Sequence, residues 1–169
     1  MTERLILTQL TQADAQQIFM LRSDEEINKF IDRAKATSID DAIRFIDKIK
    51  GVIAGGEGMF WAIHLKHEPG LIGTICYWNI LAEKQRAEIG YELLTAFQGK
   101  GIMQEALQSV LKFGFENLAF QMITAFTRYD HRNSIRLLER NNFKRNSVLE
   151  QEIAHDLNNH IIYALERPA

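Results

Sequence analysis

The chain of 169 residues has a single cysteine, Cys76, and neither sign of charge dominates, since 20 lysines and arginines stand against 22 aspartates and glutamates. One cysteine excludes an internal disulfide. The formal net charge of −2 disfavours nonspecific binding to nucleic acid. No apolar run has the length of a membrane-crossing helix, and no signal-peptide core follows the first charges. We therefore expect one globular domain, residues 1–169, in the cytoplasm, with neither a membrane nor a nucleic-acid partner.

Common motifs for metals and nucleotides are also missing. The five histidines show neither HxH nor HExxH spacing, so no metal site is predicted. The sequence contains neither the GxxxxGK[ST] of a P-loop nor the GxGxxG of a dinucleotide fold. These absences disfavour the nucleotides that such motifs bind.

Hydrophobic periodicity predicts a mixed α/β fold of about seven mostly antiparallel strands and about four helices. Strands are expected at residues 5–10, 59–65, 71–78, 88–93 and 122–127, with a closing hairpin of 148–156 and 160–167. Helices are expected after Thr11, around Ile27 and Phe30, after Ser38, and at 102–118 and 133–140. Because a helix separates strands 88–93 and 122–127, these two strands are expected to pair in parallel. The polar segment 79–86 is predicted to be a loop and a lip of a substrate site.

Residues 88–118 carry the most informative pattern, in which a strand leads through Gln98-Gly99-Lys100-Gly101 into an amphipathic helix. The first N–H groups of a helix have no partner inside it and lie at the positive end of its dipole. Glycines at the start of the helix let a phosphate approach these groups, and Lys100 adds a positive charge. The other interpretation is a tight turn in which the glycines only permit positive φ.

This turn resembles the acetyl-CoA pyrophosphate loop of the GNAT (Gcn5-related) N-acetyltransferases, whose pattern is Gln/Arg-x-x-Gly-x-Gly/Ala. Gln98 and Gly101 occupy its first and fourth positions, and Met103 replaces the small sixth residue. A second GNAT pattern is Asn-x-x-Ala/Ser-x-x-x-Tyr-x-x-x-Gly-Phe. It aligns with His131, Ser134, Leu138 and Asn142-Phe143. Segments 3–7, 87–93 and 134–140 are similar to the RimJ/RimL branch, the ribosomal-protein N-terminal acetyltransferases.

The resemblance implies a GNAT fold, in which strands 88–93 and 122–127 splay apart and the pantetheine of acetyl-CoA lies between them. It also implies that a backbone N–H near Leu93 and Leu94 polarises the thioester carbonyl, as an oxyanion donor does in other acyl transfers. The cofactor-binding residues that it implies are Leu93, Leu94, Gln98, Gly99, Lys100, Gly101, Ile102, Met103, His131 and Asn133.

Glu88 is predicted to be the general base, acting through water. Glu88, Gly90 and Glu92 share one face of their strand, and two carboxylates on one face of a central strand indicate that this face lines a cleft. The alternative is that Glu88 only pairs with Arg86 or with a neighbouring strand.

Ser134 is predicted to donate a hydrogen bond to the departing thiolate, because the family pattern places this position near the sulfur. The alternative is a helix-start serine bonded to the backbone. His131 is a rival acid or base, or an idle loop histidine. Tyr91 and Tyr129 either line the cleft or pack in the core.

The predicted function is transfer of the acetyl group from acetyl-CoA by direct attack of a primary amine, preferably a protein N-terminal α-amine. An α-amine has a pKa of about 7.7–8.0, against about 10.4 for a lysine-like amine, so it demands less of a single carboxylate. Two alternatives remain open: an acetyltransferase for a small amine (a polyamine, an aminoglycoside or an amino acid) and a noncatalytic acyl-CoA-binding module. An edge strand in the last hairpin leaves a homodimer open as well.

Overall fold

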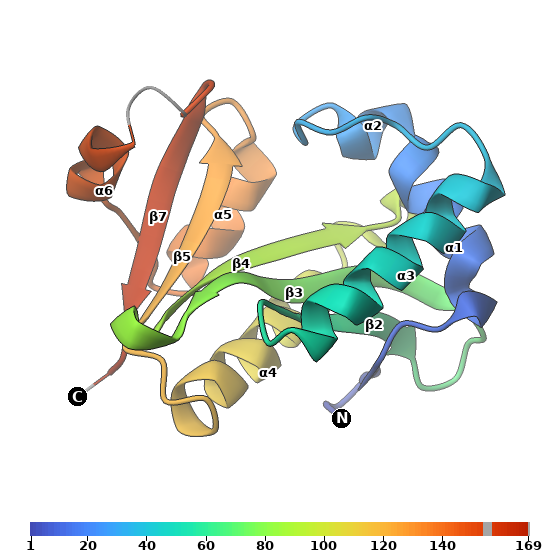
Figure 1. The fold of residues 1–169 in the computed structure, drawn as a ribbon, viewed down its shortest axis with the longest axis horizontal. Coiled ribbons are helices and arrows are strands. Elements are labelled where there is room, and N and C mark those ends of the chain that lie inside the picture. Colours follow the sequence, from blue (N-terminus) through green and yellow to red (C-terminus); the bar gives the residue numbers. More distant parts are fainter. Residues whose placement is uncertain (154–156, 169) are drawn as a thin grey trace.

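The computed structural model describes residues 1–153 and 157–168, and its strands form one sheet in the order β1-β2-β3-β4-β5-β7-β6 (Figure 1). The strands are β1 (Leu5–Thr8), β2 (Met59–Leu65), β3 (Leu71–Leu81), β4 (Arg86–Leu93), β5 (Met122–Arg128), β6 (Lys144–Arg145) and β7 (His160–Glu166). The α-helices are α1 (Ala15–Ser23), α2 (Glu25–Asn28), α3 (Ile39–Ala54), α4 (Ile102–Glu116), α5 (Arg132–Arg140) and α6 (Ser147–Glu152). The predicted α/β class and seven strands are confirmed, with six α-helices in the described residues in place of about four.

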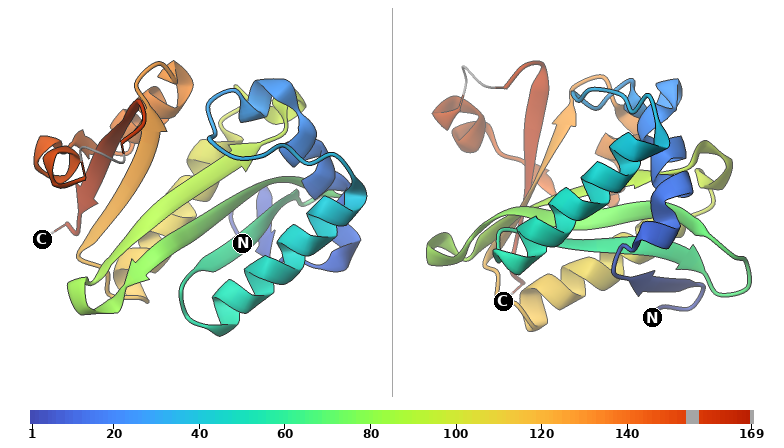
Figure 2. Two further views of the ribbon diagram at one scale, coloured as in Figure 1. Left: turned by 45° about the horizontal axis from the view of Figure 1, so that its top comes forward. Right: turned by 45° about the vertical axis from the view of Figure 1, so that its right-hand side comes forward.

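The sheet is antiparallel except between β4 and β5, which pair in parallel as predicted. Their pairing covers only three residues of β4, Arg86 to Glu88, opposite Met122 to Thr124. Beyond Glu88 the two strands diverge and form a V (Figures 1 and 2). The sheet is therefore open at its centre, toward the C-terminal ends of β4 and β5.

Helices cover the two faces of the sheet separately. The buried face of α4, which includes Ala106, Leu107 and Val110, packs in one core cluster with Ala87 and Ile89 of β4. Buried residues of α1 and α3 form a second cluster on the opposite face, against β2 and β3 (Figure 2). Because side chains alternate along a strand, odd-numbered residues of β4 face α4 and even-numbered residues face the α1 and α3 layer. In the described residues no helix is both long enough and apolar enough to cross a bilayer.

The expected strand at 148–156 is wrong. Ser147 to Glu152 form α6, and the Asn146 side chain caps this helix by accepting a hydrogen bond from the Leu149 N–H at 3.0 Å. An N-cap amide satisfies one of the free N–H groups of the first turn, which favours a helix here. Strand β7 pairs with β5 and β6 instead. Residues 154–156 of the prediction lie outside the described residues.

The predicted loop at 79–86 is also wrong for half of its length, residues 79–81 and 86. Strand β3 continues to Leu81 across an irregularity at Asn79, whose φ is 45°, and a short 3₁₀ turn at Ala82–Lys84 leads into β4. This turn lies at the end where β4 is paired with β5. It is therefore remote from the opening of the V and does not form a lip of it.

Candidate active site

A cleft of about 1170 Å³ occupies the V between β4 and β5. It has a wall on each side of the sheet. One wall comes from β4, the start of α4 and α5, and the other from α1, α2, the segment after α2, and α3. The cleft therefore reaches both faces of the sheet, so two ligands can meet within it from opposite sides.

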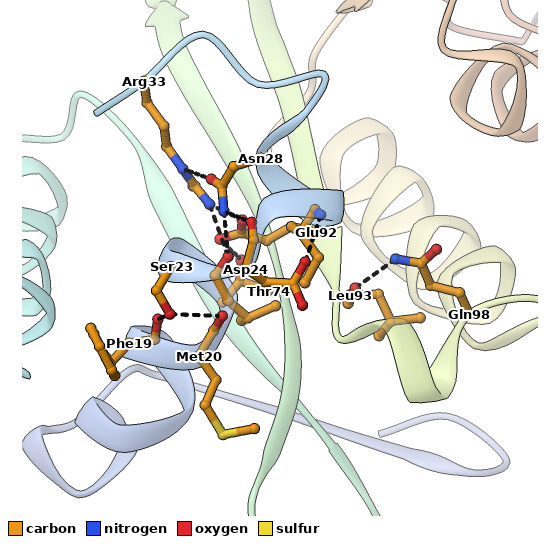
Figure 3. Close-up of polar contacts among 12 residues, drawn as sticks. Phe19, Met20, Ser23, Asp24, Asn28, Arg33, Thr74, Glu92, Leu93 and Gln98 are labelled. Atoms are coloured by element: carbon orange, nitrogen blue, oxygen red, sulfur yellow. Dashed lines mark hydrogen bonds and ion pairs between the residues drawn. The ribbon is translucent and has the colours of Figure 1, made fainter. Parts of the chain in front are cut away.

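The start of α4 has the backbone geometry that the predicted anion cradle requires, and the cradle stays a prediction. Gly101 is the N-cap of α4 with φ 73°, and no side chain caps the helix. Gly99 has the same φ, and a Cβ added to it would meet no atom within 4 Å. Gln98 holds the loop to β4 by donating a hydrogen bond from Nε2 to the Leu93 carbonyl at 2.9 Å (Figure 3). The free N–H groups at the start of α4 thus lie beside two glycines, of which Gly99 borders open space, while a Cβ added to Gly101 would lie 3.5 Å from Arg4 Nη2.

Arg4, a residue that the sequence did not single out, braces this loop from outside the cleft. Its Nη1 donates to the Lys100 carbonyl at 3.0 Å, and its Nε pairs with Glu105 Oε2 at 2.6 Å. The Lys100 ammonium lies 5.6 Å from the centre of the Phe97 ring. Lys100 therefore contributes a backbone contact to the loop, but it is not among the cleft-lining residues.

Eight of the ten predicted cofactor residues line the cleft, as do both predicted catalytic residues; Leu94 and Lys100 do not. The N–H of Leu94 donates to the Ile72 carbonyl in β3 at 2.9 Å. Because neighbouring residues of a strand direct their backbone groups to opposite sides, those of Tyr91 and Leu93 face the opening toward β5. Leu93, and not Leu94, is thus the candidate for a backbone donor. The sequence also missed Arg136 and Arg140 of α5, which line the same wall.

Ser134 and Tyr91 form a hydroxyl pair on the α4 side of the sheet. Their oxygens lie 2.9 Å apart, and either can donate to the other. Burial raises the pKa of Tyr91 to about 12, so the phenol keeps its proton at neutral pH. Leu138, which occupies the tyrosine position of the second GNAT pattern, is fully buried in the core. Leu138 thus gives the cleft no phenol from α5, and Tyr91 of β4 supplies one instead.

His131 caps α5 and contacts the opposite wall of the cleft. Its Nδ1 accepts a hydrogen bond from the Ser134 N–H at 3.5 Å, and its ring stacks on Phe30 with centroids 4.1 Å apart. Burial lowers the pKa of His131, which favours the neutral ring that such an acceptor requires. The His131 ring thus joins α5 to the segment that follows α2.

Glu88 lies on the other face of β4. Asn79 Nδ2 donates a hydrogen bond to its Oε2 at 2.9 Å, and within the described residues no cation lies within 4 Å of the carboxylate. Of the alternative stated above, the ion pair with Arg86 is not formed, whereas the contact with a neighbouring strand is, because Asn79 belongs to β3. Burial raises the pKa of Glu88, which makes its carboxylate more basic than an exposed one.

Glu92 has a different environment, although it lies on the same face. Its Oε2 pairs with Arg33 Nη2 at 2.6 Å, its Oε1 accepts from Thr74 at 3.3 Å, and Arg33 Nε donates to Asn28 at 2.6 Å (Figure 3). This network ties α2 and the segment after it to β4. Glu92 is therefore a structural ion pair, which leaves Glu88 as the carboxylate of β4 without a cation partner.

A sheet opened between two parallel strands, with free backbone on one edge and an anion cradle at the next helix, defines an acyl-CoA-dependent acyltransferase. The chain belongs to the GNAT acetyltransferase family, since the family model described as "Acetyltransferase (GNAT) domain" matches residues 4–144. It is an N-acetyltransferase that uses acetyl-CoA, and its fold is the GNAT fold. Among the described residues, no cluster of three or more histidine, cysteine or acidic side chains is arranged to hold a metal ion.

The chain is similar to several acetyltransferases of bacteria. It is 33% identical over 150 residues to the uncharacterized N-acetyltransferase YoaA of Bacillus subtilis, covering 89% of this chain and 85% of that protein. Its fold matches the ribosomal L7/L12 alpha-N-protein acetyltransferase RimL in complex with coenzyme A (TM-score 0.84, 20% identity, 98% and 95% of the two chains). It also matches the microcin C7 self-immunity acetyltransferase MccE in complex with acetyl-CoA and AMP (TM-score 0.77, 19% identity, 97% and 93%).

The residues of the cleft fit acetyl-CoA. The hydroxyl of Thr127 in β5 is buried and has no hydrogen-bond partner among the described residues, and Thr127 lines the cleft. A buried hydroxyl without a partner is costly, and an amide of a pantetheine arm offers it one. The backbone of Tyr91 and Leu93 faces the same opening, and the cradle at Gly101 suits a pyrophosphate.

Proposed function

We propose that this acetyltransferase modifies a protein N-terminal α-amine, with Glu88 as general base and the Ser134–Tyr91 pair as hydrogen-bond donor to sulfur. One observation carries the proposal. Glu88 and the hydroxyl pair line the same cleft from opposite faces of the sheet, because Glu88 and Tyr91 have opposite parity on β4. A base on one side and a hydrogen-bond donor to sulfur on the other suit an acceptor that enters opposite the cofactor.

Bound acetyl-CoA supplies an acetyl group activated as a thioester. Leu93 directs its N–H to the carbonyl oxygen, on which negative charge develops as the amine nitrogen attacks the carbonyl carbon. Glu88 takes, through a water, the proton that this nitrogen loses as the amide bond forms. Ser134, held by its hydrogen bond with Tyr91, donates a hydrogen bond to the sulfur as the carbon–sulfur bond breaks, and the proton that Glu88 has taken returns through solvent to the thiolate. The sum is an acetamide and free thiol from a neutral amine and a thioester.

The α-amine is favoured because the central strand β4 offers one carboxylate free to act as a base, while Glu26 and Asp32, which also line the cleft, are exposed. With Glu92 engaged by Arg33, Glu88 must serve alone among the carboxylates of β4. A single base suits an amine that is already about a tenth or more neutral at pH 7, as an α-amine is. The fold match to RimL, an alpha-N-protein acetyltransferase of a ribosomal protein, is compatible with this choice of acceptor.

The acceptor class is tested with an amine panel at pH 7 in which release of the CoA thiol is followed and the products are identified by mass spectrometry. Peptides with a free N-terminus are expected to exceed spermidine and lysine in kcat/KM by about tenfold or more, from their larger neutral fraction. The same peptides with a blocked N-terminus and an internal lysine are the matched controls. Acetylation of spermidine or an aminoglycoside, with the N-terminal peptides inert, would contradict the proposal.

The role of the hydroxyl pair is tested with Ser134→Ala, which is expected to lower kcat by about tenfold to a hundredfold while the KM for acetyl-CoA changes little. The proposed contact strengthens as charge develops on sulfur, so its loss appears in kcat. Tyr91→Phe is expected to lower kcat by a smaller factor than Ser134→Ala does. Because the two hydroxyls act in series, the double variant should lose less than the product of the single effects.

Ser109→Ala is the control for the hydroxyl pair, because Ser109 lies on α4 and does not line the cleft. Retention of nearly full kcat in Ser134→Ala and in the double variant would assign the Ser134 hydroxyl to a structural role, in which it only bonds Tyr91.

A further inference from the structure

The acceptor side of the cleft contains an arginine that the proposed chemistry does not use. Arg22, at the end of α1, lines the cleft, and its guanidinium carbon lies 3.9 Å from the centre of the Phe45 ring of α3. Stacking on an aromatic face fixes the plane of a guanidinium and leaves its N–H edges free for other partners. The Arg22 cation is thus held in place at the wall of the cleft.

This cation lacks a counterion in the protein. Within the described residues no carboxylate lies within 4 Å of the Arg22 guanidinium, whereas its charged neighbours are paired. Arg33 holds Glu92, and Arg44 holds Asp41, whose carboxylate also accepts from the Thr37 N–H at 2.8 Å. Burial, and then the positive charge of Arg33, lower the pKa of Arg22, and the charges of Glu92 and Asp41 oppose this shift only in part.

The geometry connects Arg22 with the proposed base. Phe45 packs edge-on against Phe60 of β2 with centroids 5.8 Å apart, and Phe60 packs edge-on against Trp78 of β3 at 4.9 Å. Trp78 is paired with Glu88 in the sheet. Arg22 and Glu88 therefore lie at the two ends of an aromatic row that runs from α3 over β2 and β3 to β4. Gly90, two residues from Glu88 on the same face of β4, has no side chain that would project between Arg22 and Glu88.

Building on the N-acetyltransferase function proposed above, we propose that the amine acceptor carries a negatively charged group, a carboxylate or a phosphate, which Arg22 binds while the amine faces Glu88. A partly desolvated cation without a partner is costly, and a bound anion offsets that cost. The planar pair of N–H groups matches two oxygens of either anion. In a peptide acceptor the charge is an acidic side chain next to the N-terminus. In a small acceptor it is a carboxylate or phosphate a few bonds from the amine.

The test compares acceptors that differ only in this charge. The pairs are a Ser-Asp and a Ser-Asn peptide of otherwise identical sequence, glutamate and glutamine, and O-phosphoethanolamine and ethanolamine. For each member of a pair, kcat/KM is measured, and calorimetry gives the Kd of the acceptor for the complex of the enzyme with CoA. At least one pair is expected to favour the charged member by about tenfold or more, the effect of a charge-assisted hydrogen bond. Arg22→Gln should abolish that preference, and Arg22→Lys should retain part of it.

The control variant is Arg44→Gln, because Arg44 also lines the cleft but is paired with Asp41. It should leave the charge preference unchanged. Equal efficiency and equal affinity within every pair, or a preference that survives Arg22→Gln, would overturn the anion subsite. The source of the charge is decided separately: a preference seen only for glutamate or O-phosphoethanolamine, with both peptides inert, supports Arg22 as the anion site and rejects the protein N-terminus as acceptor.

Discussion

Glu88→Gln is expected to lower kcat/KM for an α-amine acceptor by about 10²–10⁴-fold at neutral pH and below, the usual worth of a general base. Glutamine keeps the shape of the side chain and can still accept a hydrogen bond from Asn79, but it cannot take a proton. The variant should bind CoA with the affinity of the native protein, because Glu88 lies on the acceptor face of β4. Steady-state kinetics with a peptide acceptor, together with CoA titration, measure both quantities.

The pH profile gives a second readout. Since burial raises the pKa of Glu88, the acid limb of kcat/KM in the native enzyme should lie above the usual carboxyl range of about 4.3. Below that pKa the carboxylate is protonated and cannot act as a base. In Glu88→Gln this limb should disappear. The loss of kcat/KM relative to the native enzyme should also become smaller at alkaline pH, where the amine is already neutral. An unchanged acid limb in the variant would assign the base to another group.

The same pKa determines how the variant affects stability. A carboxyl whose pKa is raised on folding contributes stability below its unfolded pKa of about 4.3, and this contribution is lost as pH rises through the folded pKa. At pH 7 the ionised Glu88 therefore costs stability, and Glu88→Gln should melt at or above the Tm of the native protein. Glu116→Gln, at the exposed end of α4, is the control and should change neither Tm nor activity. A Tm well below that of the native protein would attribute lost activity to unfolding.

The features that the sequence predicted well depend on contacts between near neighbours. Ser38 and Asp41 predicted the start of α3, and the Asp41 carboxylate accepts from the Ser38 N–H at 3.1 Å. The parallel pairing of β4 with β5 followed from the helix between them. Asn142 replaces the glycine of the family pattern at φ 64°, a left-handed conformation that asparagine tolerates better than most residues.

The features that the sequence missed depend on distant partners or on weak local signals. Helix α6 is short, and its apolar residues fit a strand as well as a helix, so its cap decided the outcome. The extension of β3 passes an asparagine with positive φ, which breaks the alternation that identifies a strand. In the site, the hydrogen bond between Tyr91 and Ser134 joins residues 43 positions apart in the sequence, and the ion pair of Arg33 with Glu92 joins residues 59 positions apart. No local pattern indicates such pairs.

Replacing Gly101 with aspartate is expected to lower the affinity for CoA by about a hundredfold or more, while Gly101→Asn lowers it much less. Both side chains tolerate the left-handed conformation that Gly101 adopts with φ 73°, and they have nearly the same size. They differ in charge. The carboxylate of aspartate competes for the free N–H groups at the start of α4 and repels the pyrophosphate, and two like charges about 4 Å apart repel by about 1 to 4 kcal/mol at effective dielectric constants of 80 to 20.

The two Gly101 variants separate the anion cradle from a simple turn. If the glycine serves only to permit positive φ, aspartate and asparagine should weaken CoA binding equally, because both carry the same backbone cost. Gly56→Asp is the control for that cost, since Gly56 has φ 72° in open space after α3, far from the cleft. Gly56→Asp should lower the Tm as much as the Gly101 variants do, and it should leave the affinity for CoA unchanged. Calorimetric titration of CoA into the four proteins, the native one included, measures the difference, and equal affinities for the two Gly101 variants would reject the cradle.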